Sequence, residues 1–214
     1  MQIEEAIKTR RSVRKLSKGN LSKETIEKII DAGQHAPSHC NTQGWKFIFI
    51  DDEKIKNEIF ENGGSYVVKD APYGILTVYN RSLSDNIEYS DYIQSGAAAI
   101  ENMLLTIHDL GMGGCWVCHL PKKKTLIKIL KIKNPYTPIA YIAFGFPEAV
   151  LNKIERKSKI NEIYATNQFP WPEEKTGFKL RLKRILRKLY FVLPVFIKKT
   201  ISPIVDKFVK KFEN

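Results

Sequence analysis

Three guanidinium groups and a hydroxyl lie within five residues near the start of the chain. This basic run is Arg10-Arg11-Ser12-Val13-Arg14. It follows residues 3–7, whose apolar positions recur at helical spacing. Arginine binds phosphate through both arms of a planar fork, so several arginines at the end of a short helix form a dense anion site. Taken alone, the run fits a solvated basic surface slightly better than a phosphate site.

Two further clusters of polar residues favour a binding site over a solvated surface. Residues 36–45 read APSHCNTQGW and place a hydroxyl, amides and an indole on a predicted loop directly before an apolar run. Amides can recognise the edge of a heteroaromatic ring because they offer both donors and an acceptor, although Pro, Ser and Asn are also ordinary turn residues. A second basic cluster, residues 155–159, follows the last predicted strand. Together the three groups indicate a phosphorylated heterocycle as the ligand, and composition does not say which one.

Hydrophobic periodicity predicts the elements that would position these groups. Continuous apolar runs predict buried strands at 45–50, 73–79, 115–120 and 138–147. Helical spacing predicts longer helices at about 23–33, 52–61, 92–110 and 121–131. Ser22 is the expected N-cap of the first of these helices, and Gly111 is the residue expected to end the third. Intermixed strands and helices indicate an α+β or α/β layered domain.

Cysteine and histidine residues are assigned no chemistry. The chain has three cysteines, too few for a disulfide framework, which favours a reducing cytoplasm. Cys115 and Cys118 form a C-x-x-C without a second pair, so they are interpreted as packing residues rather than zinc ligands. His35 and His39 lack a nearby nucleophile and are interpreted as surface or loop residues. The first residues, MQIEEAIKTRRS, contain no apolar run, so no secretory signal is expected.

Four motifs in a fixed order carry a family resemblance. They are R-R-S-V-R, then A-P-S-x-x-N-x-Q-x-W, then an Ala-rich helix ending in L-G-M-G, and finally a G-x-P turn followed by K-S-K. Over residues 1–163 this order resembles the nitroreductase family. The resemblance implies an α+β three-layer domain, with a mixed sheet flanked by helices, in an intertwined homodimer. It also implies bound FMN that carries electrons from NADH or NADPH to a small conjugated acceptor, such as a nitroaromatic or quinone-like molecule.

The same resemblance assigns roles to the first motif. Arg10 and Arg11 would meet the FMN phosphate, Ser12 the ribityl region and Arg14 the pyrimidine edge. A cation at that edge would stabilise negative charge on the ring. Because the chemistry is centred on the flavin, no catalytic side chain and no metal are expected.

Residues of the second motif would reach the flavin of the partner subunit. They are Pro37, Ser38, Asn41 and Gln43. Gly44 stands where the family commonly has proline, which predicts a less rigid loop.

Later residues complete the site implied by the resemblance. Backbone groups of Cys118 and His119 would approach the flavin N5 atom. Lys157 and Lys159 match the late phosphate-binding pair, and the neighbouring Arg156 is an alternative to them.

The C-terminal residues differ from the rest in charge. Of the formal net charge of +12, residues 178–214 contribute eleven Lys/Arg against two acidic residues. This change in charge, and the Pro and Gly residues at 169–177 that precede it, predict three parts of the chain. They are a domain at 1–168, a Pro/Gly linker at 169–177 and a basic amphipathic tail at 178–214. One arc of the predicted helix is apolar: Phe178, Leu182, Ile185, Leu186, Leu189, Val192 and Leu193.

A basic amphipathic helix of this kind is typical of a membrane interface, and no run is long enough to span a bilayer. The tail therefore predicts a cytoplasmic protein that associates peripherally with an anionic membrane surface. A tail that docks on the partner subunit is the main alternative, and nucleic-acid binding ranks third because the arc is mostly aliphatic. An alternative to the enzyme is a flavin-binding, membrane-docking protein whose main role is interaction.

Overall fold

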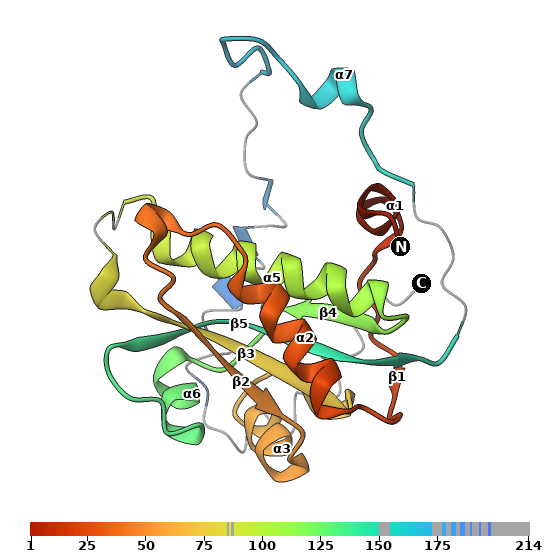
Figure 1. Cartoon of the computed structure of the whole chain (residues 1–214). Helices are drawn as coiled ribbons and strands as arrows, with labels where there is room; N and C mark the ends of the chain where they lie inside the picture. Colours follow the sequence, from red (N-terminus) through yellow and green to blue (C-terminus); the bar gives the residue numbers. More distant parts are fainter. Residues whose placement is uncertain are drawn as a thin grey trace.

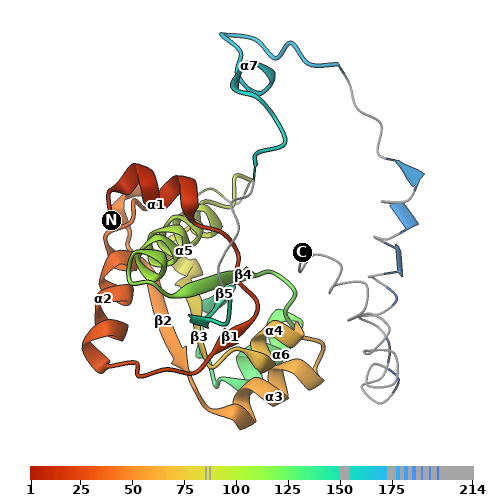
Figure 2. The same cartoon turned by 90° about the vertical axis from the view of Figure 1, so that its right-hand side faces the viewer.

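One five-stranded sheet forms the middle layer of the molecule (Figures 1 and 2). A computed structural model describes residues 1–84, 86, 88–149, 155–172, 177–178, 181–182, 185–186, 189, 193 and 197. The strands are β1 (Leu16–Ser17), β2 (Trp45–Ile50), β3 (Tyr73–Asn80), β4 (Gly113–Val117) and β5 (Tyr136–Pro147). Their order is β1-β5-β3-β2, with β4 also paired to β5. The long strand β5 is therefore the centre of the sheet.

The strand pairs are all antiparallel. A parallel bridge joins Ser12 to Gly114, outside the named strands. The mixed sheet implied by the family resemblance thus needs correction. Within the described residues, the ladder is antiparallel and its parallel component is confined to this bridge.

Helices cover both faces of the sheet, as Figures 1 and 2 show. On one side lie α1 (Ile3–Thr9), α2 (Lys23–Gln34) and α5 (Asp91–Asp109). On the other lie α3 (Glu53–Glu61), α4 (Tyr66–Asp70) and α6 (Lys123–Ile129). Short 3-10 turns η1 (His39–Asn41) and η2 (Arg81–Leu83) precede β2 and α5, and α7 (Ile160–Ile163) follows the sheet. The three layers expected from the sequence are confirmed.

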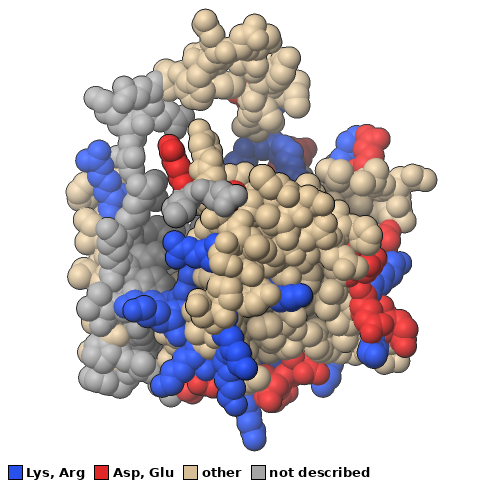
Figure 3. All heavy atoms as spheres, turned by 60° about the vertical axis from the view of Figure 1, so that its left-hand side comes forward, with Lys and Arg blue, Asp and Glu red and all other residues tan. Residues whose placement is uncertain are grey.

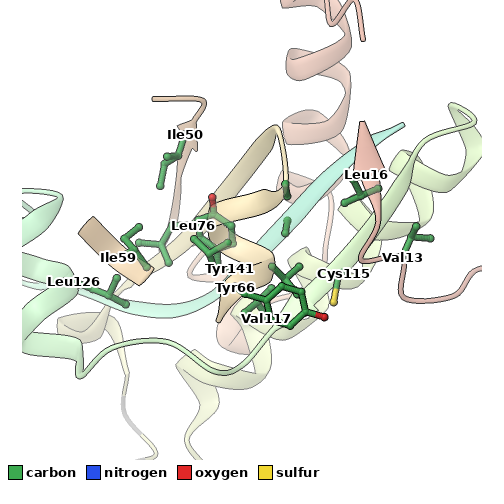
Figure 4. Close-up of a cluster of buried hydrophobic side chains, with 14 of the residues drawn as sticks. Val13, Leu16, Ile50, Ile59, Tyr66, Leu76, Cys115, Val117, Leu126 and Tyr141 are labelled. Carbon is green, nitrogen blue, oxygen red and sulfur yellow. The ribbon is translucent and has the colours of Figure 1, made fainter. Parts of the chain in front are cut away.

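Two apolar clusters fasten the helices to the sheet. Under α5, fully buried Ile100, Met103 and Ile107 pack with Ile142 and Phe144 of β5. Burying one such side chain contributes about 1.5–3 kcal/mol. A second cluster fills the space under α3, α4 and α6, and Figure 4 shows its members. The long helix α5 is therefore a rigid support for whatever its ends and outer face carry.

Local signals place the helix ends as predicted. The Ser22 hydroxyl accepts a hydrogen bond from the Thr25 N–H at 3.2 Å, so Ser22 caps α2. Gly111, with φ +73°, follows the end of α5 in the left-handed region that favours glycine.

One strand is displaced from its predicted position. The sequence predicts a strand at 115–120, whereas β4 is Gly113–Val117 and ends before Cys118. Glycine is a weak strand former, so the pattern conceals the first two residues of β4. Cys118 and His119 therefore follow the strand, on the segment that leads to α6.

Candidate functional site

The basic segment 10–14 lies along β4. The Val13 N–H donates to the Gly114 carbonyl at 3.0 Å. A Cβ on Gly113 would stand 2.8 Å from the Val13 Cβ, and one on Gly114 would stand 2.9 Å from Leu104 of α5. Only glycine permits this approach. Gly113, the last residue of the L-G-M-G motif, and Gly114 after it thus seat β4 between the basic segment and α5.

Buried apolar residues anchor the basic segment. Val13 and Leu16 are buried beside Cys115 and Val117, as Figure 4 shows. The guanidinium-bearing residues of the segment are half-buried, and Ser12 is exposed. Apolar anchors that point inward leave polar neighbours on the outer side of the segment. The predicted phosphate-binding residues are therefore held at a surface before any ligand binds.

Arg10 is also oriented by α5. Its Nε and Nη2 atoms lie 3.2 and 3.1 Å from the Glu101 carboxylate, and the Arg10 side chain is 24% exposed. Nearby, the Thr9 hydroxyl and the His108 Nε2 are 2.8 Å apart. Burial, together with the Arg10 charge, lowers the pKa of His108. Glu101 and His108 thus join the site, and the sequence pattern did not single them out.

The C-x-x-C pair divides into one buried and one exposed thiol. Cys115 is buried in β4, and burial raises the pKa of its thiol, against the opposing effects of the Arg14 charge and a hydrogen bond with Ser12. The packing interpretation is confirmed for Cys115 and is wrong for Cys118, which is exposed. The next residue, His119, accepts the Ser65 N–H on its carbonyl oxygen at 2.9 Å, which fixes the exit of β4 against α4.

The amide loop 37–43 adopts a strained backbone. Cys40, Asn41 and Gln43 have φ of 44°, 54° and 47°, in the left-handed region. Such a conformation costs about 1–3 kcal/mol for a residue other than glycine, less for asparagine, and persists where the surroundings impose it. The Ser38 hydroxyl accepts the Gln43 N–H at 3.0 Å, and the Gln43 amide donates to the Asn41 Oδ1 at 2.7 Å.

The strained loop presents its predicted flavin-contacting residues to solvent. Pro37, Asn41 and Gln43 are exposed, and Ser38 is half-buried. Gly44 closes the loop tightly, because a Cβ there would lie 2.6 Å from Tyr79. Gly44 therefore permits close packing at this end of the loop, an effect that the family comparison of glycine with proline did not predict.

His39 ties the loop to α5. Its backbone N–H donates to the Ser95 hydroxyl at 3.1 Å, and its Nδ1 lies 3.0 Å from the same oxygen. Its Nε2 donates to the Leu83 carbonyl at 2.8 Å and lies 3.6 Å from the Asp91 carboxylate. With a side chain only 13% exposed, His39 is a buried loop anchor rather than the surface residue that was one of its predicted interpretations.

Asp91 completes this anchor at the start of α5. Its carboxylate accepts the Ser84 hydroxyl and the backbone N–H groups of Asn86 and Tyr92. These hydrogen bonds, with a smaller contribution from His39, lower the pKa of Asp91 against the opposing effect of burial. The serine before Asp91 makes no side-chain hydrogen bond that caps α5, so the local sequence carried no signal for this buried carboxylate.

The two candidate regions contact different parts of α5. The amide loop meets the helix at Ser95, whereas the basic segment meets it through Arg10 at Glu101. At 1.5 Å per residue, these two contacts are about 9 Å apart along the axis. Thr9, which precedes the segment, lies further along the helix, beside His108. Figure 1 shows α1 and the segment before β2 at the two ends of the helix. The amide loop and the basic segment therefore lie at separate positions along α5.

The late basic cluster, residues 155–159, lies apart from the basic segment and from the amide loop. Lys157 and Lys159 are exposed, and α7 projects from the body of the molecule in Figures 1 and 2. The Lys159 N–H donates to the Glu162 carboxylate at 3.0 Å, so Lys159 is the N-cap of α7. Large apolar residues of this arm are also exposed: Ile160, Ile163, Tyr164 and Phe169.

Two small residues of α5 face the sheet. Gly96 and Ala99 are buried, and a Cβ on Gly96 would lie 3.0 Å from Ile139 of β5. Those two positions let α5 approach β5 closely.

Comparison with known proteins agrees with this architecture. The model of the nitroreductase family matches residues 7–67 and 57–146. A Methanothermobacter thermautotrophicus protein with the provisional name NADH dehydrogenase/NAD(P)H nitroreductase is 32% identical over 151 residues, which are 69% of this chain and 78% of that protein. An Archaeoglobus fulgidus protein with the same provisional name is 32% identical over 168 residues, 74% of this chain and 95% of that protein.

Solved structures give the same result. A provisionally assigned nitroreductase from Desulfovibrio desulfuricans, solved in complex with FMN, superposes with a TM-score of 0.69 at 28% identity. The superposition covers 79% of this chain and 99% of that one. The chain studied here belongs to the nitroreductase family and is an oxidoreductase of that family.

Proposed function

We propose that this protein is an FMN-dependent reductase that uses NAD(P)H and acts as a homodimer on a small conjugated acceptor, such as a nitroaromatic or quinone-like molecule. The observation that carries the proposal is the preformed basic segment on β4. Its arginines are half-buried and held by packing at Val13 and Leu16. A site that is ordered before binding loses less entropy when its ligand binds.

The donor set of this segment fits the phosphate end of FMN. Arg10 and Arg11 supply forked, permanently charged groups, and the Ser12 hydroxyl is exposed beside them. The Glu101 carboxylate orients the Arg10 guanidinium through its Nε and Nη2 atoms, which supports a role for Arg10 in this site. We assign the phosphate to Arg10 and Arg11, the ribityl chain to Ser12 and the pyrimidine edge to Arg14.

The exposed amide loop fits the ring of a flavin. Asn41 and Gln43 each offer donors and an acceptor, and both lie in solvent on a loop that is anchored from below by His39. Cys118 and His119, after β4, are assigned to the ring as well. When bound, FMN would supply the chemistry by accepting hydride from NAD(P)H and passing electrons to the acceptor.

A homodimer is supported by the exposure of the amide loop, which presents Asn41 and Gln43 to solvent rather than to the basic segment of its own chain. If the loop of one subunit meets the basic segment of the other, each site contains parts of both chains. The exposed apolar arm around α7 supports the same proposal, because it offers surface for a second copy to bury. Lys157 and Lys159 would then be brought to the phosphate by assembly.

Spectroscopy of the purified full chain tests the enzyme. We expect a yellow protein whose flavin absorbance bleaches when NADH or NADPH is added without oxygen and returns when a nitroaromatic or a quinone is added. Comparing the two nucleotides identifies the donor. A protein that stays colourless with excess FMN, or a bound flavin that neither nucleotide bleaches, would contradict the proposal.

A further inference from the structure

The tail, residues 178–214, carries most of the net charge of the chain. Its eleven Lys/Arg and two acidic residues give +9, whereas residues 1–177 have 24 basic and 21 acidic residues and a net charge of +3. Figure 3 shows one face of the molecule, on which basic and acidic side chains both occur among uncharged residues. Strong positive charge is thus a property of the tail and not of the body.

The described part of the tail also exposes apolar side chains at helical spacing. Residues 178, 181–182, 185–186 and 189 have helical backbone, and the Arg181 N–H donates to the Gly177 carbonyl at 3.2 Å. Five large apolar residues are between 43% and 77% exposed: Phe178, Leu182, Ile185, Leu186 and Leu189. Such a contiguous exposed row is typical of a surface that binds something.

The tail lies outside the part of the chain that the family accounts for. The family match ends at residue 146. The Desulfovibrio desulfuricans structure is covered to 99%, yet it accounts for only 79% of this chain. A function of the tail is therefore an addition to the flavin chemistry and does not depend on it.

We propose that the tail docks this protein on an anionic lipid surface, as a helix that lies in the interface. The charge distribution selects this partner. A second copy offers a body of net charge +3, which repels rather than attracts a tail of +9. A nucleic acid would favour stacking aromatics, and four of the five exposed residues are aliphatic. Anionic headgroups and acyl chains satisfy the basic and the aliphatic side chains together.

The docking mode is peripheral. Among the helices in the described part of the chain, none is long and apolar enough to cross a membrane. An interfacial helix needs only to bury its apolar side at the boundary between headgroups and acyl chains. Electrostatic attraction extends about 8–10 Å at physiological salt, so it acts only on residues near the surface.

Co-sedimentation of the full chain with vesicles tests this proposal. The probes are vesicles of equal parts phosphatidylcholine and phosphatidylserine, with phosphatidylcholine alone as reference. Two full-length variants separate the contributions. The first removes apolar groups: Leu182→Gln, Ile185→Gln, Leu186→Gln and Leu189→Gln. The second removes charges: Lys179→Gln, Arg181→Gln, Lys183→Gln and Arg184→Gln.

We expect the parent to bind the anionic vesicles and to bind less as salt is raised. Each basic residue contributes about fivefold to partitioning, so the charge variant should lose roughly several hundredfold. The apolar variant should lose about tenfold or more for each side chain that enters the bilayer. Both variants should keep the parent's oligomeric state and flavin content.

Three results would overturn the proposal. Equal binding of the parent to both kinds of vesicle would exclude recognition of anionic lipid. Dissociation of either variant into monomers, with unchanged vesicle binding, would identify the tail as a clasp between subunits. Binding of the parent to duplex DNA, but not to anionic vesicles at the same salt, would assign the tail to nucleic acid.

Discussion

The basic segment and the amide loop, which contact different parts of α5, are held in place by different forces. The segment 10–14 is fixed by a backbone hydrogen bond to Gly114 and by apolar packing where Gly113 leaves no room for a side chain. The loop 37–43 is fixed by side-chain hydrogen bonds, centred on His39, that impose a left-handed backbone. Substitutions that change side-chain volume should therefore disturb the basic segment, whereas the loss of single hydrogen-bonding groups should disturb the amide loop.

Replacement of Arg10 by alanine should have the largest effect. It removes a charge-assisted contact worth about 1.5–3 kcal/mol, so the dissociation constant for FMN should rise about ten- to hundredfold. Fluorescence titration with FMN measures this directly. Lys8→Ala is the matched control, because Lys8 is 70% exposed and pairs with Glu4 on the surface. Equal affinities of the parent and the Arg10→Ala protein would remove the phosphate assignment.

Gly113→Val tests packing in the same region. A side chain there must displace Val13, which lies 2.8 Å from the position of the added Cβ. Overpacking of this kind costs about 1–3 kcal/mol, and a chain of this size should lose about 2–4 °C in melting temperature for each kcal/mol. FMN affinity should fall as well, because the basic segment moves with Val13.

The matched control for Gly113→Val is Gly177→Ala, where an added Cβ meets nothing within 4 Å in the described residues. A Gly113→Val protein with the melting temperature and the FMN affinity of the parent would show that the basic segment is not held by packing.

His39→Ala tests the polar anchor of the loop. Loss of its bonds to Ser95 and Leu83 should weaken the loop by about 1 kcal/mol, which is about fivefold in the FMN dissociation constant. His35→Ala is the control, since His35 has a 71% exposed side chain at the surface end of α2. If both variants bind FMN alike, the loop does not depend on His39.

The smallest expected effect is that of Asp91 on the stability of the protein in acid. The pKa of Asp91 in the folded protein lies below its ordinary value of 3.8, so its stabilising contribution is present above that value. The contribution is lost as pH falls through the lowered pKa. The melting temperature of the parent should therefore fall more steeply below about pH 4 than that of Asp91→Asn. Parallel slopes for the two proteins would exclude this role.

Much of the fold was predictable because its signals are local. Ser22 caps α2, Gly111 follows α5, and the continuous apolar runs at 45–50 and 73–79 form β2 and β3. The start of β4 was missed because Gly113 and Gly114 carry no side-chain pattern, although their lack of side chains is what the packing requires.

The site was only partly predictable. Short motifs indicated the basic segment and the amide loop. The partners that hold them, Glu101, Ser95 and Asp91, are far away in sequence and ordinary in type. Long-range pairing depends on the three-dimensional fold, and one sequence carries no record of it.

The central claim is that each flavin site combines the basic segment of one chain with the loop of the other. A heterodimer of two defective chains, isolated with two affinity tags, tests it directly. One chain carries Arg10→Ala and Arg14→Ala, and the other carries Asn41→Ala and Gln43→Ala. If sites are shared, one site collects both defects and the other is wholly intact. The account predicts one tightly bound FMN per heterodimer, although the homodimer of each defective chain binds FMN weakly. A heterodimer that binds FMN as weakly as the two defective homodimers would show that each chain builds its own site, and would contradict the account.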